Sequence, residues 1–215
     1  MKGAVTALTV HWELLDDAAR ADMFGVLQRN AGSLGDLIDQ LLDFAHVGLD
    51  DGVNAASLVD ASDVDLSEVV TLVVSDVKPA LAPERITLDV VPGVRAYADP
   101  MTIRRILTNL LENAIKYAPS HTPITVEVRA DGDGAVMAVE DEGYGIPPGE
   151  RARVFERFYR SQSALSLRTR GLGIGLSLVR ALVEALGGTV TVEDGPRAGG
   201  ARFVVRLRGG DAAAG

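Results

Sequence analysis

The chain contains no cysteine, so neither a disulfide nor a cysteine-ligated zinc ion holds its fold together. Aromatic residues make up only 5% of the sequence, which leaves the core to aliphatic side chains. No apolar run is long enough to cross a bilayer, and the N-terminus has no signal-peptide pattern. A formal net charge of −9 argues against a broad nucleic-acid surface but allows a local basic pocket for phosphate. We therefore expect neither nucleic acid among the partners nor a membrane segment in this chain.

The first fifty residues carry two helical patterns of apolar residues. In the first pattern, apolar residues recur at alternating spacings of three and four. The second is a seam with a period of seven, formed by Leu27, Leu34 and Leu41. A hairpin of two such helices leaves an apolar stripe that a second copy of the hairpin would cover in a four-helix bundle. We therefore expect residues 1–50 to be a helical-hairpin dimerisation domain; a hairpin packed on its own domain is the alternative.

The rest of the chain divides into a linker, a second domain and a tail. Residues 51–63 are rich in Gly, Asn, Ser and acidic residues, which break both helical patterns and indicate a linker. From Val64 the sequence alternates between helical and strand patterns, and we assign 64–208 to the second domain. The small residues of 209–215 indicate a disordered tail.

The second domain is expected to be an α/β sandwich in which helices cover one face of a mixed sheet. With the helical hairpin before it, the whole chain is therefore of the α+β class. Helices are expected at 66–81, 100–117 and 176–186. Strands are expected at 86–90, 95–98, 124–129, 135–140, 189–193 and 201–207.

The helix expected at 100–117 carries a polar face near its C-terminal end. Asn109, Asn113 and Lys116 lie at i, i+4 and i+7 and therefore share one side of the helix. Two amides and an ammonium suit phosphate oxygens and a hydrated Mg²⁺, because magnesium prefers hard oxygen ligands and retains several waters. Taken alone, the same three residues are more typical of a solvated helix face; the glycine-rich segments that follow favour the phosphate site.

Two glycine-rich segments follow that helix. Asp141 to Ile146 comes after an expected strand, where a carboxylate can accept from an adenine amino group and glycines admit a base close to the backbone. An Asp-Gly turn at a strand end is the alternative. Gly171 to Leu176 opens a helix, whose N-terminal amide groups favour phosphate. Its spacing differs from that of the dinucleotide-binding fingerprint, and the chain has no P-loop.

The three segments, in this order and spacing, resemble the ATP-binding domain of sensor histidine kinases, in the wider family that includes gyrase, Hsp90 and MutL ATPases. The resemblance implies ATP and Mg²⁺ as cofactors, with Asn113 as the metal ligand and Tyr117 near the sugar or base. It implies that Asn109, Asn113 and Lys116 are the catalytic residues, with Asn109 and Lys116 at the phosphates. It further implies that the nucleotide is bound by Asp141, Gly143, Gly145, Ile146, Arg168, Arg170, Gly171, Leu172, Gly173, Ile174, Gly175 and Leu176.

Between the two glycine-rich segments, Phe155 to Arg160 resembles the aromatic box that flanks the ATP lid in these kinases. We expect Phe155 and Phe158 to share a helical face and to anchor the lid. The polar segment 161–169 is then the mobile lid. An arginine at this lid could contact the γ-phosphate; the three that bracket it are Arg160, Arg168 and Arg170.

The resemblance implies the cytoplasmic catalytic core of a bacterial sensor histidine kinase, which transfers the γ-phosphoryl group of ATP to a histidine and onward to a response-regulator aspartate. In this family the phosphoacceptor histidine precedes the sequence Pro-Leu-Thr-Ala-Ile, which residues 4–8 match here. We therefore expect the acceptor to fall just ahead of Met1. None of the three histidines present, His11, His46 and His121, fits that position. The chain alone is then not expected to phosphorylate itself.

The partners implied are a second copy of the chain, through the hairpin, and a response regulator. Any membrane segment of the full-length protein is expected outside this chain. Two other functions stay open. One is an ATP-binding pseudokinase that acts as a scaffold or inhibitor, because no acceptor histidine is present. The other is a serine kinase or ATPase of the same superfamily, such as an anti-sigma factor, against which the helical hairpin and the aromatic box argue.

Overall fold

The computed structural model describes residues 16, 19–20, 24–25, 59–81, 84–161, 172–195 and 199–210, except for the side chains of 78–80. The chain divides into two compact units, Met1–His46 and Val47–Gly215. In the first unit, Ala19 and Arg20 are helical, and the backbone N–H of Ala19 donates to the carboxylate of Asp16 at 2.7 Å. That bond is typical of a helix N-cap, at the acidic break between the two expected helices. Phe24 and Gly25 are also helical, and the other residues of the predicted hairpin lie outside the described residues.

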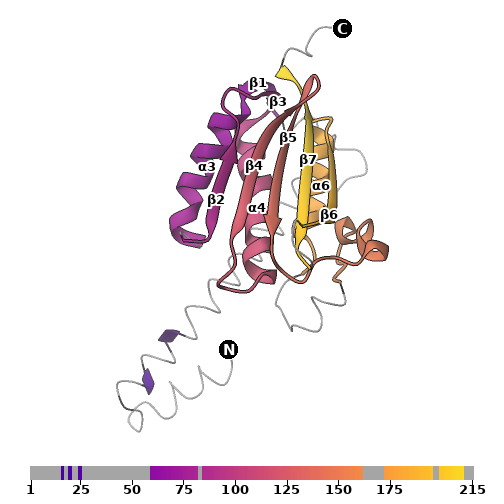
Figure 1. The fold of residues 1–215 in the computed structure, drawn as a ribbon. Helices are drawn as coiled ribbons and strands as arrows, with labels where there is room; N and C mark the ends of the chain where they lie inside the picture. The colour runs from indigo at the N-terminus through magenta and orange to yellow at the C-terminus, as the bar shows by residue number, and fades with distance from the viewer. Residues whose placement is uncertain are drawn as a thin grey trace. The chain divides into compact units, whose positions relative to one another are not determined.

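The second unit is built on a five-stranded sheet with the strand order β2-β4-β5-β7-β6 (Figure 1). Strands β2 and β4 are parallel, and the other neighbours are antiparallel, so the predicted mixed sheet is confirmed. The bounds of the strands are Ile86–Val90 (β2), Ile124–Asp131 (β4), Gly134–Asp141 (β5), Thr189–Asp194 (β6) and Ala201–Arg208 (β7).

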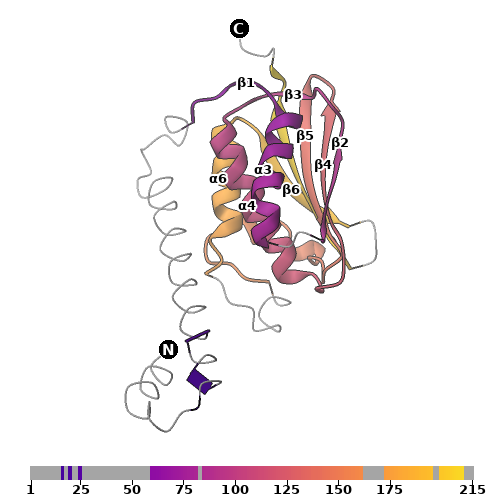
Figure 2. The same cartoon turned by 90° about the vertical axis from the view of Figure 1, so that its left-hand side faces the viewer.

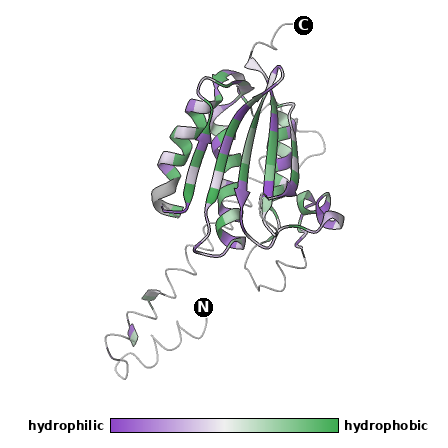
Figure 3. Ribbon diagram, in the orientation of Figure 1, coloured by the Kyte–Doolittle hydropathy of each residue, from purple (hydrophilic) through white to green (hydrophobic). Residues whose placement is uncertain are grey.

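Three helices cover one face of this sheet, as the sequence predicts (Figure 2). They are α3 (Leu66–Leu81), α4 (Pro100–Tyr117) and α6 (Gly175–Ala185). Hydrophobic and hydrophilic residues alternate along β4, so that every second side chain of this strand enters the core, whereas β5 is buried from Ala135 to Val139 (Figure 3). The core between helices and sheet is aliphatic, as the scarcity of aromatics requires; its fully buried side chains include Leu66, Ile86, Ile103, Ile106, Leu107, Leu110, Leu111, Ile124 and Met137.

Helix α4 is fixed at both ends by its own sequence. Asp99 is the N-cap, and its carboxylate accepts the backbone N–H groups of Met101 and Thr102 at 3.2 and 3.0 Å. Pro100 occupies the first helical position, where its missing N–H costs nothing. At the other end Ala118 is extended, as the residue before a proline tends to be. The polar residues near the C-terminal end of α4 are therefore held in a defined register.

A second, two-stranded sheet pairs β1 (Ser62–Asp65) with β3 (Arg95–Ala98) in antiparallel fashion. The sequence predicts β3 but not β1, because four residues with a single large apolar side chain show no clear alternation. Long-range contacts define β1 instead: the guanidinium of Arg95 donates to both carboxylate oxygens of Asp63, through Nε and Nη2. Val59 also packs against the core. The folded unit therefore begins before residue 64, within the segment expected to be linker.

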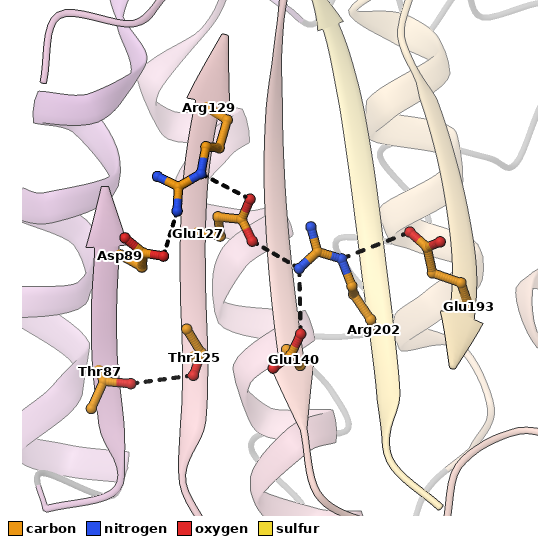
Figure 4. Close-up of polar contacts among 8 residues, drawn as sticks. All are labelled: Thr87, Asp89, Thr125, Glu127, Arg129, Glu140, Glu193 and Arg202. Carbon is orange, nitrogen blue, oxygen red and sulfur yellow. Dashed lines mark hydrogen bonds and ion pairs between the residues drawn. The ribbon is translucent and has the colours of Figure 1, made fainter. Parts of the chain in front are cut away.

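The face of the sheet opposite the helices carries ion pairs that link β2 to β4 and β7 to β4 and β5 (Figure 4). Arg202 on β7 contacts Glu127 on β4 at 2.8 Å and Glu140 on β5 at 3.3 Å. A small buried cluster of Val136, Ala138 and Val204 lies on β5 and β7 beside them. A single ion pair near the surface contributes little, but these partly buried pairs of Arg202 span several strands and support the register that ends β5 at Asp141.

Candidate functional site

The three sequence segments are the polar face of α4, Asp141 to Ile146, and Gly171 to Leu176. The first and the third meet at Asn109 and Gly175. The side-chain amide of Asn109 donates to the backbone carbonyl of Arg105 at 2.9 Å, one helical turn earlier. Its Oδ1 faces Gly175, the first residue of α6, so closely that a Cβ there would lie 2.9 Å from it. Asn113 and Lys116 are both half-buried on the same side of α4, farther toward its C-terminal end. The polar face of α4 thus runs from the N-terminus of α6 toward Tyr117.

The second segment packs against the C-terminal end of α4. Asp141 ends β5, is only 4% exposed, and accepts the backbone N–H of Gly143 at 2.8 Å. A Cβ on Gly143 would lie 2.7 Å from the backbone carbonyl oxygen of Tyr117, which cannot move cheaply. Glycine is required here by close packing between two distant parts of the chain, which a simple Asp-Gly turn does not require.

A loop with no clear signal in the sequence supports the same segment. Gly145 has a φ of +62°, and a Cβ on it would lie 2.6 Å from the carbonyl oxygen of Gly199. Gly200, next to Gly199 in the β6–β7 loop, packs directly on the carbonyl oxygen of Asp141. Ile146 packs against the core. The adjacent glycines before the last strand were the available signal, although the sequence alone does not say which loop they contact.

The third segment, Gly171 to Leu176, also contacts the aromatic box, Phe155 to Arg160. Gly173 has a φ of +72°, and its carbonyl accepts the backbone N–H of Phe158 at 2.9 Å. Ile174 is buried, Leu176 packs against the core, and Leu172 is 39% exposed. The other predicted residues of this part of the site, Arg168, Arg170 and Gly171, and nearly all of the expected lid, lie outside the described residues.

The prediction that Phe155 and Phe158 share a helical face is wrong. Phe155 ends a short 3₁₀ turn (η4, Arg153–Phe155), is buried, and meets the ring of Phe203 edge to face at 6.3 Å. Phe158 has a left-handed backbone, with φ at +62°, and is 64% exposed. The segment turns after Glu156, whose extended backbone ends the 3₁₀ turn, and the bond to Gly173 fixes the next residues. A contact remote in sequence therefore overrides the local helical spacing.

Positive charge gathers at the end of α4. Burial lowers the pKa of Lys116, and the charge of Arg160 lowers it further, while Glu112 raises it. Burial raises the pKa of Tyr117, which Arg160 lowers. The Nζ of Lys116 lies 5.2 Å from the centroid of the Tyr117 ring. The charge of Arg160 therefore acts on both residues, and a local positive charge at this end of α4 would suit a phosphate anion.

Asp141 has a different electrostatic environment. Burial raises the pKa of its carboxyl group, and the charge of Glu140 also raises it. The backbone N–H groups of Gly143 and Ala201 and the charge of Arg85 lower the same pKa. Asp141 is thus a buried acceptor whose ionised form depends on a few identifiable neighbours.

The donor set also bears on the implied magnesium ion. Within the described parts of the chain, no group of three or more His, Asp or Glu side chains could hold a metal. Asn113 offers an amide oxygen on the same face of α4 as Asn109 and Lys116. Such a face fits a cation that keeps several waters and takes its remaining ligands from phosphate, as Mg²⁺ does.

This fold and site define a class: an α/β-sandwich domain with a nucleotide-type site built from one helix and two glycine-rich loops. Residues 98–210 match the family model described as "Histidine kinase-, DNA gyrase B-, and HSP90-like ATPase". The match spans more than half of the chain, and the chain therefore belongs to this family.

Its curated relatives are two-component sensor kinases. The chain is 35% identical over 194 residues to the signal transduction histidine-protein kinase/phosphatase MprB of Mycobacterium avium, covering 88% of this chain and 34% of that protein. It is 31% identical over 204 residues to the sensor protein RstB of Escherichia coli, covering 94% and 45%. The chain thus spans less than half the length of these relatives. No helix in the described part of the chain is long and apolar enough to cross a membrane.

Solved structures agree with this assignment. A mycobacterial sensor histidine kinase MprB superposes with a TM-score of 0.61 at 33% identity, over 69% of this chain and 98% of that one. Full-length ShkA in complex with AMPPNP superposes with a TM-score of 0.69 at 28% identity, over 93% and 41%.

Proposed function

We propose that this chain binds ATP with Mg²⁺ and transfers the γ-phosphoryl group to a histidine of a sensor kinase. One observation carries the proposal: three segments far apart in the sequence converge around the C-terminal half of α4. Asn109 faces Gly175 of the third segment, and the Tyr117 carbonyl packs on Gly143 of the second. A solvated helix face or an isolated turn would have no reason for these close contacts.

Each part of the site suits a different part of the nucleotide. The buried carboxylate of Asp141 would accept the adenine amino group, with Gly143, Gly145 and Ile146 lining the base. Lys116 and Arg160 would hold phosphate oxygens, and so would the amide groups that begin α6. We extend the phosphate contacts to Arg168, Arg170 and Gly171 as a proposal that rests on their sequence positions.

Asn113 is the proposed magnesium ligand. Bound there, the ion would neutralise charge on the triphosphate and orient it. In the reaction, a histidine nitrogen forms a bond to the γ-phosphorus while the bond to the bridging β–γ oxygen breaks, and ADP leaves. The chain would act by positioning and by charge neutralisation, since phosphoryl transfer asks little covalent chemistry of the protein.

The partners follow from the same proposal. Residues 1–50 would pair with a second copy to form the four-helix bundle, and 51–63 would connect that bundle to the catalytic domain. A response-regulator aspartate would then receive the phosphoryl group from the histidine.

The experiment is phosphoryl transfer in trans. The chain is mixed with γ-labelled ATP, magnesium and a related helical hairpin that bears an acceptor histidine, and acid-labile label on the hairpin is measured. Label on the hairpin with wild-type chain, and none with Asn113→Ala, supports the kinase. Nucleotide binding without transfer supports the scaffold instead, and acid-stable label on serine supports the anti-sigma alternative.

A further inference from the structure

Arg85, just before β2, ties together the loop that connects α4 to β4. Its Nε donates to the carbonyl of Thr122 at 2.9 Å, and its Nη2 donates to the carbonyl of Pro119 at 2.9 Å. Its own carbonyl accepts the backbone N–H of Ile124 at 2.8 Å. One residue thus holds both ends of the loop 118–123. A planar guanidinium can make this two-carbonyl contact, whereas an ammonium is a point charge.

Both ends of this loop belong to the proposed nucleotide site. The loop leaves α4 directly after Tyr117, whose carbonyl packs on Gly143. It enters β4 at Ile124, which is paired in register with Asp141 of β5. A second bond network keeps the loop compact, because the Pro119 carbonyl also accepts from the backbone N–H and the hydroxyl of Thr122. A shift of the loop would therefore move Tyr117 and Asp141 relative to one another.

The charge of Arg85 also reaches Asp141. Burial raises the pKa of that carboxyl group and Arg85 lowers it. The other groups that act on it are the carboxylate of Glu140, which raises its pKa, and the backbone N–H groups of Gly143 and Ala201, which lower it. Glu140 is itself paired with Arg202, on the opposite face of the sheet.

We propose that Arg85 is a positioning residue of the nucleotide site, which clamps the loop 118–123 and thereby holds Asp141 in place to accept the adenine amino group. This inference rests on the proposed function, since it assumes that Asp141 reads adenine. Arg85 acts through the loop and through Asp141 and does not itself touch the nucleotide.

The test is ADP affinity as a function of pH, measured by calorimetry on the full chain. Every protein in this comparison, including the reference with Arg85 that is called wild type below, carries His121→Gln, which removes a titratable side chain from the same loop. Arg85→Gln loses the charge and the two-carbonyl contact. Its affinity should fall about tenfold at neutral pH, as expected for loss of hydrogen bonds from a charged donor. Its acid limb should also move to higher pH, because without the arginine Asp141 takes up a proton more readily.

Arg85→Lys separates the two roles. It keeps the charge, so its acid limb should stay near that of wild type, while its affinity at neutral pH should still fall because an ammonium cannot bridge both carbonyls. Asp141→Asn, which has no carboxyl group to titrate, shows the pH dependence that comes from ADP itself. Thermal melts identify any variant that has not folded, and Arg85→Lys still tests the clamp if Arg85→Gln is one of these.

An Arg85→Gln profile that drops equally at every pH overturns the charge effect on Asp141, and one that matches wild type overturns the proposal. Wild-type affinity in Arg85→Lys overturns the clamp. If the wild-type chain binds no ADP, the proposed function fails and this inference fails with it, whereas normal binding by wild type and by both Arg85 variants overturns the inference alone.

Discussion

The backbone carbonyl of Tyr117 lies so close to Gly143 that a Cβ on the glycine would come within 2.7 Å of it. The same Cβ would lie 2.7 Å from Oδ1 of Asp141. This one contact joins the end of α4 to the loop that begins at Asp141. Neither partner can give way freely, since one is backbone and the other is a buried carboxylate that accepts the Gly143 N–H.

Gly143→Ala should therefore disturb the site more than the fold. We expect a loss of about 1–3 kcal/mol in the free energy of unfolding, the usual cost of overpacking, and at least a tenfold weaker affinity for ADP. Gly149→Ala is the matched control, because nothing lies within 4 Å of a Cβ at that position. Chemical denaturation and calorimetry measure the two quantities. Equal ADP affinity in the two variants would show that the close packing of Gly143 on Tyr117 does not shape the site.

Asn113→Ala tests the metal face of α4. Asn113 is half-buried and makes no contribution to the apolar core of the helix, so its removal should change stability by less than about 1 kcal/mol. Magnesium-dependent binding of ATP should be lost, because the proposed ligand is absent. Calorimetry with magnesium and with EDTA separates the part of the ATP affinity that depends on magnesium from the part that does not. The control is Met101→Ala, a change at an exposed residue at the other end of the same helix. Unchanged affinity for Mg·ATP in Asn113→Ala would show that the ion binds elsewhere.

Asp141→Asn should strengthen the fold while it weakens the site. The pKa of Asp141 is raised from its usual 3.8, mainly by burial, so the folded state favours the neutral carboxyl group. For a group whose pKa rises on folding, its stability contribution is fully present below the unfolded pKa and is lost as pH rises through the folded pKa. At neutral pH the wild-type chain therefore bears the cost of a buried charge that asparagine avoids.

We accordingly expect Asp141→Asn to be the more stable protein at neutral pH, with the advantage shrinking as the pH is lowered. ADP affinity should fall about 10- to 100-fold, as for the loss of a charged hydrogen bond. Denaturation at several pH values and calorimetry provide the measurements. A stability difference that does not change with pH would mean that the carboxyl group has the same pKa in the folded and unfolded chain.

The sequence predicts the sheet and the three covering helices because their signals are local. Each signal lies within the element that it defines or directly beside it. Examples are the alternation along β4, the Asp99-Pro100 cap of α4 and the glycines that follow α6. For the same reason the shared face of Asn109, Asn113 and Lys116 follows from helical spacing alone. The N-terminal hairpin has an equally clear pattern, and it stays a prediction.

What the sequence did not predict depends on contacts between distant residues. β1 forms because it pairs with β3 in antiparallel fashion and because Arg95 forms an ion pair with Asp63. Gly199 and Gly200 matter because they pack on Gly145 and Asp141, more than fifty residues earlier. Arg85 looks like an ordinary surface charge until the loop 118–123 folds over it. No spacing rule connects these pairs, so only the folded chain identifies them.

Phe155 and Phe158 show the same limit and give a sharp paired test. The two rings are alike in sequence, but Phe155 is buried against Phe203 and Phe158 is largely exposed on a left-handed backbone. Phe155→Ala should lower the free energy of unfolding by about 3–5 kcal/mol, as for other buried phenylalanines. Phe158→Gly places glycine at the left-handed position and so relieves about 1–2 kcal/mol of backbone strain. This gain offsets the loss of stability that comes from the greater entropy of glycine in the unfolded chain.

The stability of Phe158→Gly should therefore stay within about 0.5–1 kcal/mol of wild type. Phe158→Ala is its control, because alanine removes the ring but keeps the strained backbone, and it should be the less stable of the two. Urea denaturation of the three variants decides the matter. If Phe158→Gly proved as damaging as Phe155→Ala, the exposed ring would have to support the fold, and the left-handed turn held by Gly173 would not be the reason that the aromatic segment bends.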